Sequence, residues 1–162
     1  MEIKPLEAHH WNEVKRIYEE GIATRNATFE TSAPSWDVWD NAYLKSCRFV
    51  VLDGNVVAGW AALTPVSGRC VNAGVADISV YVSEMYRGKK IGSMLLQQLI
   101  ESSEKEGLWT LQAGIFPENK ASVALHKKKG FQLIGARQKI GKMDNVWRDT
   151  LLLERRSKTV GL

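Results

Sequence analysis

The segment YRGKKIGS, residues 86–93, joins an alternating strand pattern to a helical pattern and carries two glycines and three basic residues. Glycine lets the backbone adopt a positive φ and approach a ligand closely. The start of a helix offers unpaired N–H groups and a partial positive charge, to which Arg87, Lys89 and Lys90 add full charges. The segment therefore predicts an anion site suited to a pyrophosphate, although a plain strand-to-helix turn explains the glycines equally well. It lacks both the three-glycine dinucleotide pattern and the Gly-Lys-Ser/Thr of a nucleotide P-loop.

Outward from this segment, hydrophobic periodicity predicts alternating strands and helices. Strands are expected over residues 3–6, 48–52, 56–63, 75–82, 108–115, 131–138 and 146–154, and helices over residues 9–23, 36–44, 91–105 and 118–129. The sequence contains no internal repeat, low-complexity stretch or linker. We therefore expect a mixed α/β sheet covered by helices, in a single domain over residues 1–162.

Composition excludes several classes of protein. The chain has 162 residues, of which 44% are hydrophobic and 25% charged, with a net charge of +4. No run approaches the roughly 20 apolar residues that span a bilayer, and the N-terminal residues do not resemble a secretory signal. Cys47 and Cys70 fit neither a disulfide framework nor a zinc motif, and the three histidines are scattered. We expect a cytoplasmic protein with no metal and no membrane partner.

Two motifs together resemble the GNAT superfamily of acyl-CoA-dependent N-acetyltransferases. They are Arg-Gly-x-x-Ile-Gly-Ser at residues 87–93 and Asn-x-x-Ser-x-x-Leu-His-x-x-x-Gly-Phe at residues 119–131. Within the superfamily, the chain is most similar to the phosphinothricin and methionine sulfoximine acetyltransferase group. That group carries an Asn-x-Thr-Phe-x-Thr-x-x-Pro segment, matched at residues 26–34, and an acid-x-x-Val-Tyr-Val strand, matched at residues 77–82.

The resemblance implies a single, mostly antiparallel mixed sheet, flanked by about four helices, with a V-shaped split between its central strands. In the superfamily acetyl-CoA lies in this split as the co-substrate. Its pantetheine forms backbone hydrogen bonds with the first of the two separated strands, here residues 80–82. Its phosphates bind to the glycine-containing loop, here residues 87–93. This sequence departs from the family at Lys90, where glycine is usual. The cofactor-binding residues so implied are Val80, Tyr81, Val82, Arg87, Gly88, Lys89, Lys90, Ile91, Gly92, Ser93, Asn119 and Lys128.

Acetyl transfer to an amine requires removal of a proton, because alkylamines with a pKa of about 10 are mostly protonated at neutral pH. Asp77 is the candidate base, acting through a water, since it stands where the group carries a glutamate. A strand carboxylate paired with a surface lysine is the alternative interpretation. Glu30 is the rival acid, either as base or as ligand of the acceptor ammonium. His126, at the place of a frequent tyrosine acid, either protonates the departing thiolate or hydrogen-bonds the cofactor.

The acceptor side is less well defined by the sequence. The resemblance implies Phe29, Glu30 and Arg69 as acceptor-binding residues, with Arg69 holding a carboxylate or phosphinate. Ser67 and Asn72 stand where relatives carry a basic and an aromatic residue. These departures leave the identity of the acceptor open.

We therefore expect an acetyl-CoA-dependent N-acetyltransferase that acts on a small amino-acid-like amine by direct attack in a ternary complex, as a homodimer. Two alternatives remain: a non-catalytic module that binds acyl-CoA or nucleic acid, and an acetyltransferase acting on a protein amine. Much of the positive charge gathers at residues 87–90 and 120–129, which in this fold flank one groove. That distribution favours a local anion site over nucleic acid.

Overall fold

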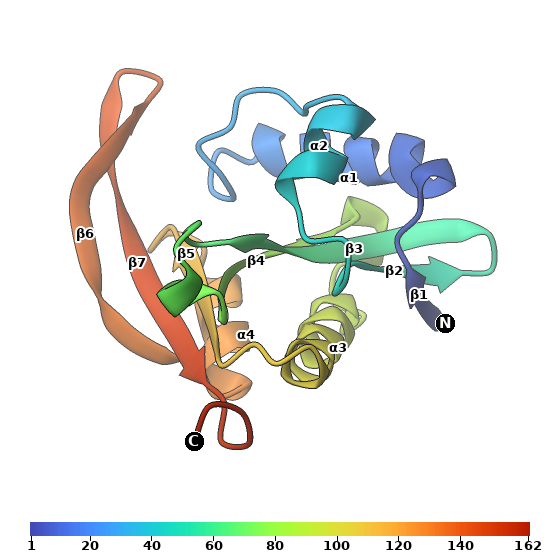
Figure 1. The fold of residues 1–162 in the computed structure, drawn as a ribbon. Coiled ribbons are helices and arrows are strands. Elements are labelled where there is room, and N and C mark those ends of the chain that lie inside the picture. The colour runs from blue at the N-terminus through green and yellow to red at the C-terminus, as the bar shows by residue number, and fades with distance from the viewer.

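The computed structural model describes residues 1–162, which build one seven-stranded sheet with helices on both faces (Figure 1). The strand order is β1-β2-β3-β4-β5-β7-β6, and only β4 and β5 are parallel neighbours. The strands are β1 (Glu2–Pro5), β2 (Phe49–Asp53), β3 (Val56–Pro65), β4 (Val75–Val82), β5 (Thr110–Ile115), β6 (Gln132–Met143) and β7 (Val146–Arg156). The helices are α1 (Trp11–Ala23), α2 (Trp36–Ala42), α3 (Ile91–Lys105) and α4 (Lys120–Lys128). The predicted mixed, mostly antiparallel fold is thus confirmed.

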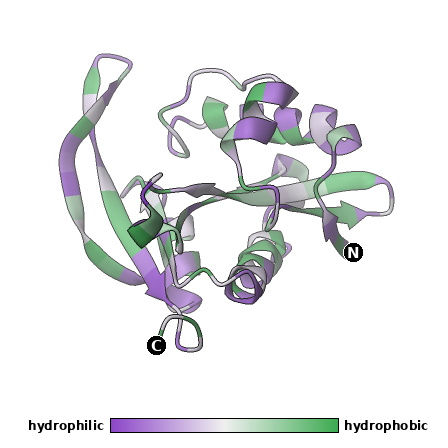
Figure 2. Ribbon diagram, in the orientation of Figure 1, coloured by the Kyte–Doolittle hydropathy of each residue, from purple (hydrophilic) through white to green (hydrophobic).

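Two hydrophobic cores hold the sheet between its helices. On one face, Leu95 and Leu99 of α3 pack with buried residues of β2, β3 and β5. On the other face, Trp39 of α2 and Tyr18 of α1 pack against Trp60 of β3. Figure 2 shows hydrophobic and hydrophilic residues alternating around α3, as expected of a helix with one buried side. No helix is both long and apolar enough to cross a membrane.

β4 and β5 run as neighbours over only part of their length. Val75–Asp77 pairs with Thr110–Gln112. Beyond these residues β4 continues against β3, and β5 continues against β7. β4 stays paired with β3 and β5 stays paired with β7, so β4 and β5 separate from each other while both remain extended. The expected V-shaped split is present, and it opens immediately after Asp77.

The β6–β7 hairpin is longer than the sequence predicted. We expected a turn over residues 139–145, but pairing continues to Met143 and Val146, and the turn is the pair Asp144 and Asn145. Both turn residues have positive φ, 51° and 64°, as in the two-residue turns that suit hairpins. Most residues of β6 are exposed, so the strand carries no hydrophobic alternation that would reveal its full length. The first helix also differs slightly, because residues 8–10 form a 3₁₀ turn before α1.

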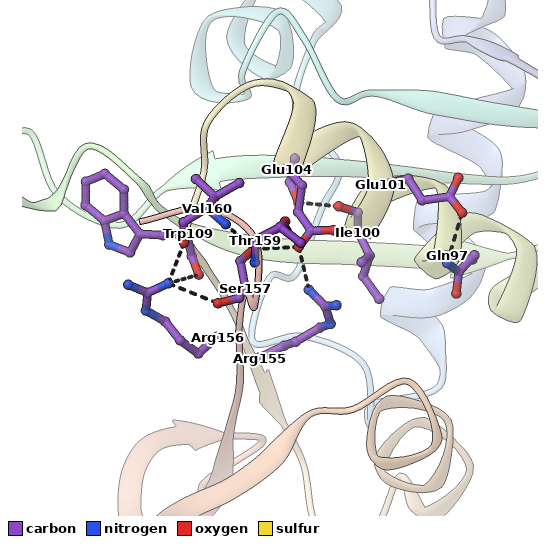
Figure 3. Close-up of polar contacts among 11 residues, drawn as sticks. Gln97, Ile100, Glu101, Glu104, Trp109, Arg155, Arg156, Ser157, Thr159 and Val160 are labelled. Atoms are coloured by element: carbon purple, nitrogen blue, oxygen red, sulfur yellow. Dashed lines mark hydrogen bonds and ion pairs between the residues drawn. The ribbon is translucent and has the colours of Figure 1, made fainter. Parts of the chain in front are cut away.

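The C-terminal turn is fastened to the end of α3 through Glu104 (Figure 3). The carboxylate of Glu104 accepts hydrogen bonds from the hydroxyls of Ser157 and Thr159 and lies 3.6 Å from Arg155 Nη1. The Ser157 hydroxyl also accepts from the backbone N–H of Val160 at 3.0 Å. These contacts lower the pKa of Glu104, chiefly through the Ser157 hydroxyl and against a smaller effect of burial.

We predict that Glu104→Gln lowers the free energy of unfolding at pH 7 by about 1–2 kcal/mol, because charge-assisted hydrogen bonds are lost. The folded-state pKa lies below the unfolded value of about 4.3, so this stabilisation is complete above that value. It disappears as the pH falls through the folded-state pKa. Urea titrations at pH 7 and in acid measure it, and equal stability of both proteins at pH 7 would contradict the prediction.

Candidate active site

A cavity of about 440 Å³ fills the opening between β4 and β5. Its walls come from the separated parts of both strands, from the segment Asn26–Phe29, from the start of α4 and from the β6–β7 hairpin. Five parts of the chain that are far apart in sequence therefore meet around one space.

The backbone of β4 presents free polar groups to this opening. The Ser83 N–H donates to the Ala58 carbonyl at 2.9 Å, which marks these residues as a hydrogen-bonded pair of the β3–β4 ladder. Such pairs alternate along an antiparallel ladder, so the backbone groups of Val80 and Val82 point away from β3. They lie beyond the last residues of β4 that pair with β5. An extended ligand can hydrogen-bond to them as an added strand does.

Asp77 is the last residue of β4 that pairs with β5, and its half-buried side chain lines the cavity. Gln112, its neighbour on β5, donates from Nε2 to Asp77 Oδ1 at 2.9 Å. Burial raises the pKa of Asp77, while the Gln112 hydrogen bond and the charge of Arg137 oppose that rise. Asp77 forms no ion pair with a lysine, so the surface-pair alternative does not describe it.

Ser79 and Tyr81 lie on the same face of β4 as Asp77 and also line the cavity. The ring of Tyr81 stacks on Trp60 with centroids 4.9 Å apart and planes 12° apart. The hydroxyls of Tyr43 and Ser79 are hydrogen-bonded at 3.0 Å. Burial raises the pKa of Tyr81, so its hydroxyl stays protonated near neutral pH. Tyr81 thus contributes its side chain, while the backbone of Val80 and Val82 faces the opening.

The segment 86–93 has the features of an anion site at the start of α3. The first backbone hydrogen bond of the helix runs from Met94 N–H to the Lys90 carbonyl, at 3.1 Å. The three preceding N–H groups, of residues 91–93, therefore have no partner within the helix. Arg87, Lys89 and Lys90 are exposed and form no ion pair, so their charges are available to an anion.

Lys90, the departure from the family pattern, adopts φ 63° and ψ 21°, which is the left-handed conformation. That conformation costs an L-residue about 1–2 kcal/mol and suits glycine, which explains why glycine is usual in relatives. Gly88 has φ 79°, so two positions of this short loop curve the backbone in the same sense. Lys90 therefore keeps the backbone shape that a glycine would favour and adds a charge.

His126 and Asn119, both of α4, line the far side of the cavity. His126 is buried, and its Nδ1 lies 2.7 Å from the Ser122 carbonyl. Because a carbonyl only accepts, Nδ1 carries the hydrogen, and Nε2 of the neutral ring is an acceptor. Burial lowers the pKa of His126, which keeps the ring neutral near pH 7. Asn119 caps α4 by accepting from Ser122 N–H at 3.3 Å.

Arg148 of β7 ties the cavity wall at residues 24–29 to the loop before α4. Its guanidinium donates to the Arg25 carbonyl at 2.8 Å, to Asn26 Oδ1 at 2.8 Å and to Glu118 Oε1 at 3.1 Å. Asn119 Nδ2 adds a hydrogen bond to the Asn26 carbonyl at 3.2 Å. The segment at Asn26 is therefore held to both β7 and α4.

The predicted acceptor residues are divided between two cavities. Phe29 lines the cavity of Asp77, with its ring edge-on to Phe116 at 4.9 Å between centroids. Glu30, one residue later, is exposed and lines a second cavity of about 430 Å³ with Tyr18 and Tyr43. The two rival acids of the sequence analysis thus face different spaces.

Arg69 and Lys128 lie outside both of these cavities. Arg69 is exposed in the loop after β3, where its backbone N–H donates to the Ser67 hydroxyl at 3.1 Å. Lys128 is exposed at the end of α4. The expectation that Arg69 contacts the acceptor stays a prediction, although Arg69 does not line the cavity of Asp77.

Sequence reasoning missed three side chains that shape the site: Gln112, Arg137 and Arg148. Gln112 left a signal, as a polar residue inside an otherwise apolar strand pattern. Arg137 and Arg148 left none, because each reaches the site only through the pairing of β6 with β7 and of β7 with β5.

Comparisons with known proteins agree with this geometry. A family model described as the acetyltransferase (GNAT) family matches residues 9–131. The Bacillus subtilis protein YwnH, provisionally assigned as a phosphinothricin acetyltransferase, is 32% identical over 161 residues, covering 96% of this chain and 98% of that protein. An L-methionine sulfoximine/L-methionine sulfone acetyltransferase of Pseudomonas aeruginosa is 37% identical over 81 residues, 50% of this chain and 47% of that protein.

Among solved structures, one similar protein is a GNAT superfamily phosphinothricin acetyltransferase from Sinorhizobium meliloti in complex with acetyl-CoA. It matches with a TM-score of 0.89 and 26% identity, covering 99% of this chain and 90% of that chain.

We predict that Arg148→Gln loosens residues 25–29, because the hydrogen bonds from Arg148 to the Arg25 carbonyl and to Asn26 Oδ1 are lost. Amide hydrogen exchange in this segment should accelerate by about tenfold or more, corresponding to about 1–2 kcal/mol of local stability. Arg137→Gln on the neighbouring strand is the matched control and should leave this exchange unchanged. Equal exchange in wild type and Arg148→Gln would contradict the role assigned to Arg148.

Proposed function

This chain belongs to the acetyltransferase (GNAT) family, as the resemblance predicted, and we propose that it transfers acetyl from acetyl-CoA to the amine of a small amino-acid-like acceptor. The observation that carries the proposal is the opening after Asp77. It combines the free edge of β4 with a carboxylate in one cavity, and the start of α3, with its unpaired N–H groups, follows β4 in the chain.

The residues present fit acetyl-CoA. Val80 and Val82 offer unpaired backbone groups to an extended amide chain, as pantetheine is. The N–H groups of residues 91–93 and the charges of Arg87, Lys89 and Lys90 suit phosphates. When bound, acetyl-CoA supplies an acetyl group activated as a thioester.

We propose Asp77 as the general base. Its burial raises its pKa, which makes the carboxylate a better proton acceptor than an exposed aspartate. The hydrogen bond from Gln112 fixes its orientation. An aspartate side chain is short, so it takes the proton of the acceptor ammonium through one water. The backbone N–H of Val82 is the proposed donor to the negative charge that develops on the acyl oxygen.

His126 and Glu30 take supporting roles in this proposal. With Nδ1–H engaged by Ser122, neutral His126 offers Nε2 as an acceptor, which favours hydrogen bonding to the cofactor over donating a proton to a thiolate. Glu30 faces the second cavity, where its charge attracts the acceptor ammonium toward the site. Neither cysteine lines the Asp77 cavity, so the proposal is direct attack in a ternary complex without an acyl-enzyme.

Two further expectations belong to the same proposal: a homodimer, from the family resemblance, and a cytoplasmic location, from the composition. The β6–β7 hairpin supports a homodimer because several of its large apolar side chains are exposed, and contact with a second copy would cover apolar surface. These side chains are Leu133, Ile134, Ile140, Val146 and Trp147.

The test is a thiol-release assay with acetyl-CoA and a panel of amines. The panel should contain amino acids, their sulfone, sulfoximine and phosphinate analogues, and a peptide with a free N-terminus. Turnover of the amino-acid analogues supports the proposal, whereas turnover of the peptide alone favours a protein acceptor. Acetyl-CoA binding in calorimetry without any thiol release favours a non-catalytic module.

We predict that Asp77→Asn lowers kcat/KM for the acceptor by about 100- to 10,000-fold, because the amide cannot take the proton. In the wild type, kcat/KM should fall as the pH is lowered through the raised pKa of Asp77, and this limb should vanish in the variant. Calorimetry should show unchanged acetyl-CoA binding. If Asp77→Asn retains activity while Glu30→Gln loses it, Glu30 is the base.

We predict opposite effects of Lys90→Gly on stability and on cofactor binding. Glycine relieves the left-handed strain, so the free energy of unfolding should rise by about 0.5–1 kcal/mol. The lost charge should raise KM for acetyl-CoA a few-fold, with less effect at high salt. Urea titration and initial rates measure the two effects, and an unchanged KM would show that Lys90 is only a surface lysine.

A further inference from the structure

An acid and a strong base are among the residues that line the Asp77 cavity: Asp77 itself and Arg137. Their charges are opposite, yet no ion pair joins them. A cavity with one anion and one cation held apart is complementary to a ligand that carries both charges.

Arg137 reaches the cavity through the sheet. It lies on β6 opposite Thr150 of β7, which also lines the cavity. Its side chain is exposed and has no hydrogen bond to the protein, so all five N–H donors remain free. Its charge is nevertheless close enough to lower the pKa of Asp77. Arg137 is thus an unengaged guanidinium within electrostatic reach of the proposed base.

We propose that Arg137 binds the acidic group of the acceptor while Asp77 receives its amine, so that Arg137 selects acceptors that carry a carboxylate or phosphinate. This inference rests on the proposed function and names a specificity residue for it. The planar guanidinium forms two parallel hydrogen bonds with such a group, which a point charge does not. Arg69, which the sequence suggested for this role, lies outside the cavity.

The test compares L-methionine sulfone with its primary amide in the thiol-release assay, using wild type, Arg137→Gln and Arg137→Lys. Wild type should prefer the acid by about 10- to 100-fold in kcat/KM. Arg137→Gln should lose this preference through a higher KM for the acid, with kcat and the KM for acetyl-CoA nearly unchanged. Arg137→Lys should show an intermediate preference for the acid, because lysine keeps the positive charge but lacks the planar guanidinium that forms two parallel hydrogen bonds.

The matched control is Lys142→Gln, another exposed basic residue of β6, which should keep the wild-type preference. Melting curves should be alike for all variants, since the Arg137 side chain has no hydrogen bond to lose. The inference is overturned if Arg137→Gln keeps the preference for the acid, if Arg69→Gln abolishes it, or if wild type prefers the amide.

Absence of thiol release with every amine would refute the proposed function instead. Calorimetry of L-methionine sulfone with the acetyl-CoA-loaded protein then decides the role of Arg137 without turnover. Tighter binding by wild type than by Arg137→Gln supports the inference, and equal or undetectable binding by both overturns it.

Discussion

The end of the pairing between β4 and β5 at Asp77 and Gln112 is the constraint on which the rest of the site depends. β3 holds the outer edge of one strand and β7 the outer edge of the other, so neither strand can curl back to close the gap. Buried backbone polar groups without partners are costly. When a sheet leaves such groups facing a cavity, a ligand that forms hydrogen bonds with them is bound favourably.

The two hydrophobic cores fix the angle of the opening from both faces of the sheet. α3 packs against β2, β3 and β4, and this packing fixes the place of its unpaired N–H groups after the end of β4. The aromatic cluster of α1, α2 and β3 supports Tyr81 on the other face. Arg148 then holds the wall around Asn26 in place from β7. The unpaired N–H groups of α3 and the charged side chains of the cavity thus lie on elements that packing has already positioned.

Local sequence patterns predicted the order of the elements and the anion-binding segment because both depend on neighbouring residues. Alternation identified β4, helical periodicity identified α3, and the glycines and basic residues between them identified the loop. The same reasoning failed on the β6–β7 hairpin, since an exposed edge strand needs no hydrophobic alternation. The family resemblance contributed the V-shaped split, which no local pattern encodes.

The sequence by itself determined the local conformations and the inventory of charges, including the basic loop before α3 and the acid at residue 77. Only the tertiary structure decided which charges share a space. It placed Arg137 with Asp77, and it left Glu30 in a second cavity and Arg69 outside both. The physical reason is that strand pairing joins residues that are far apart in sequence. The register of two paired strands depends on both strands and on the sheet in which they lie, so neither strand's sequence alone specifies it.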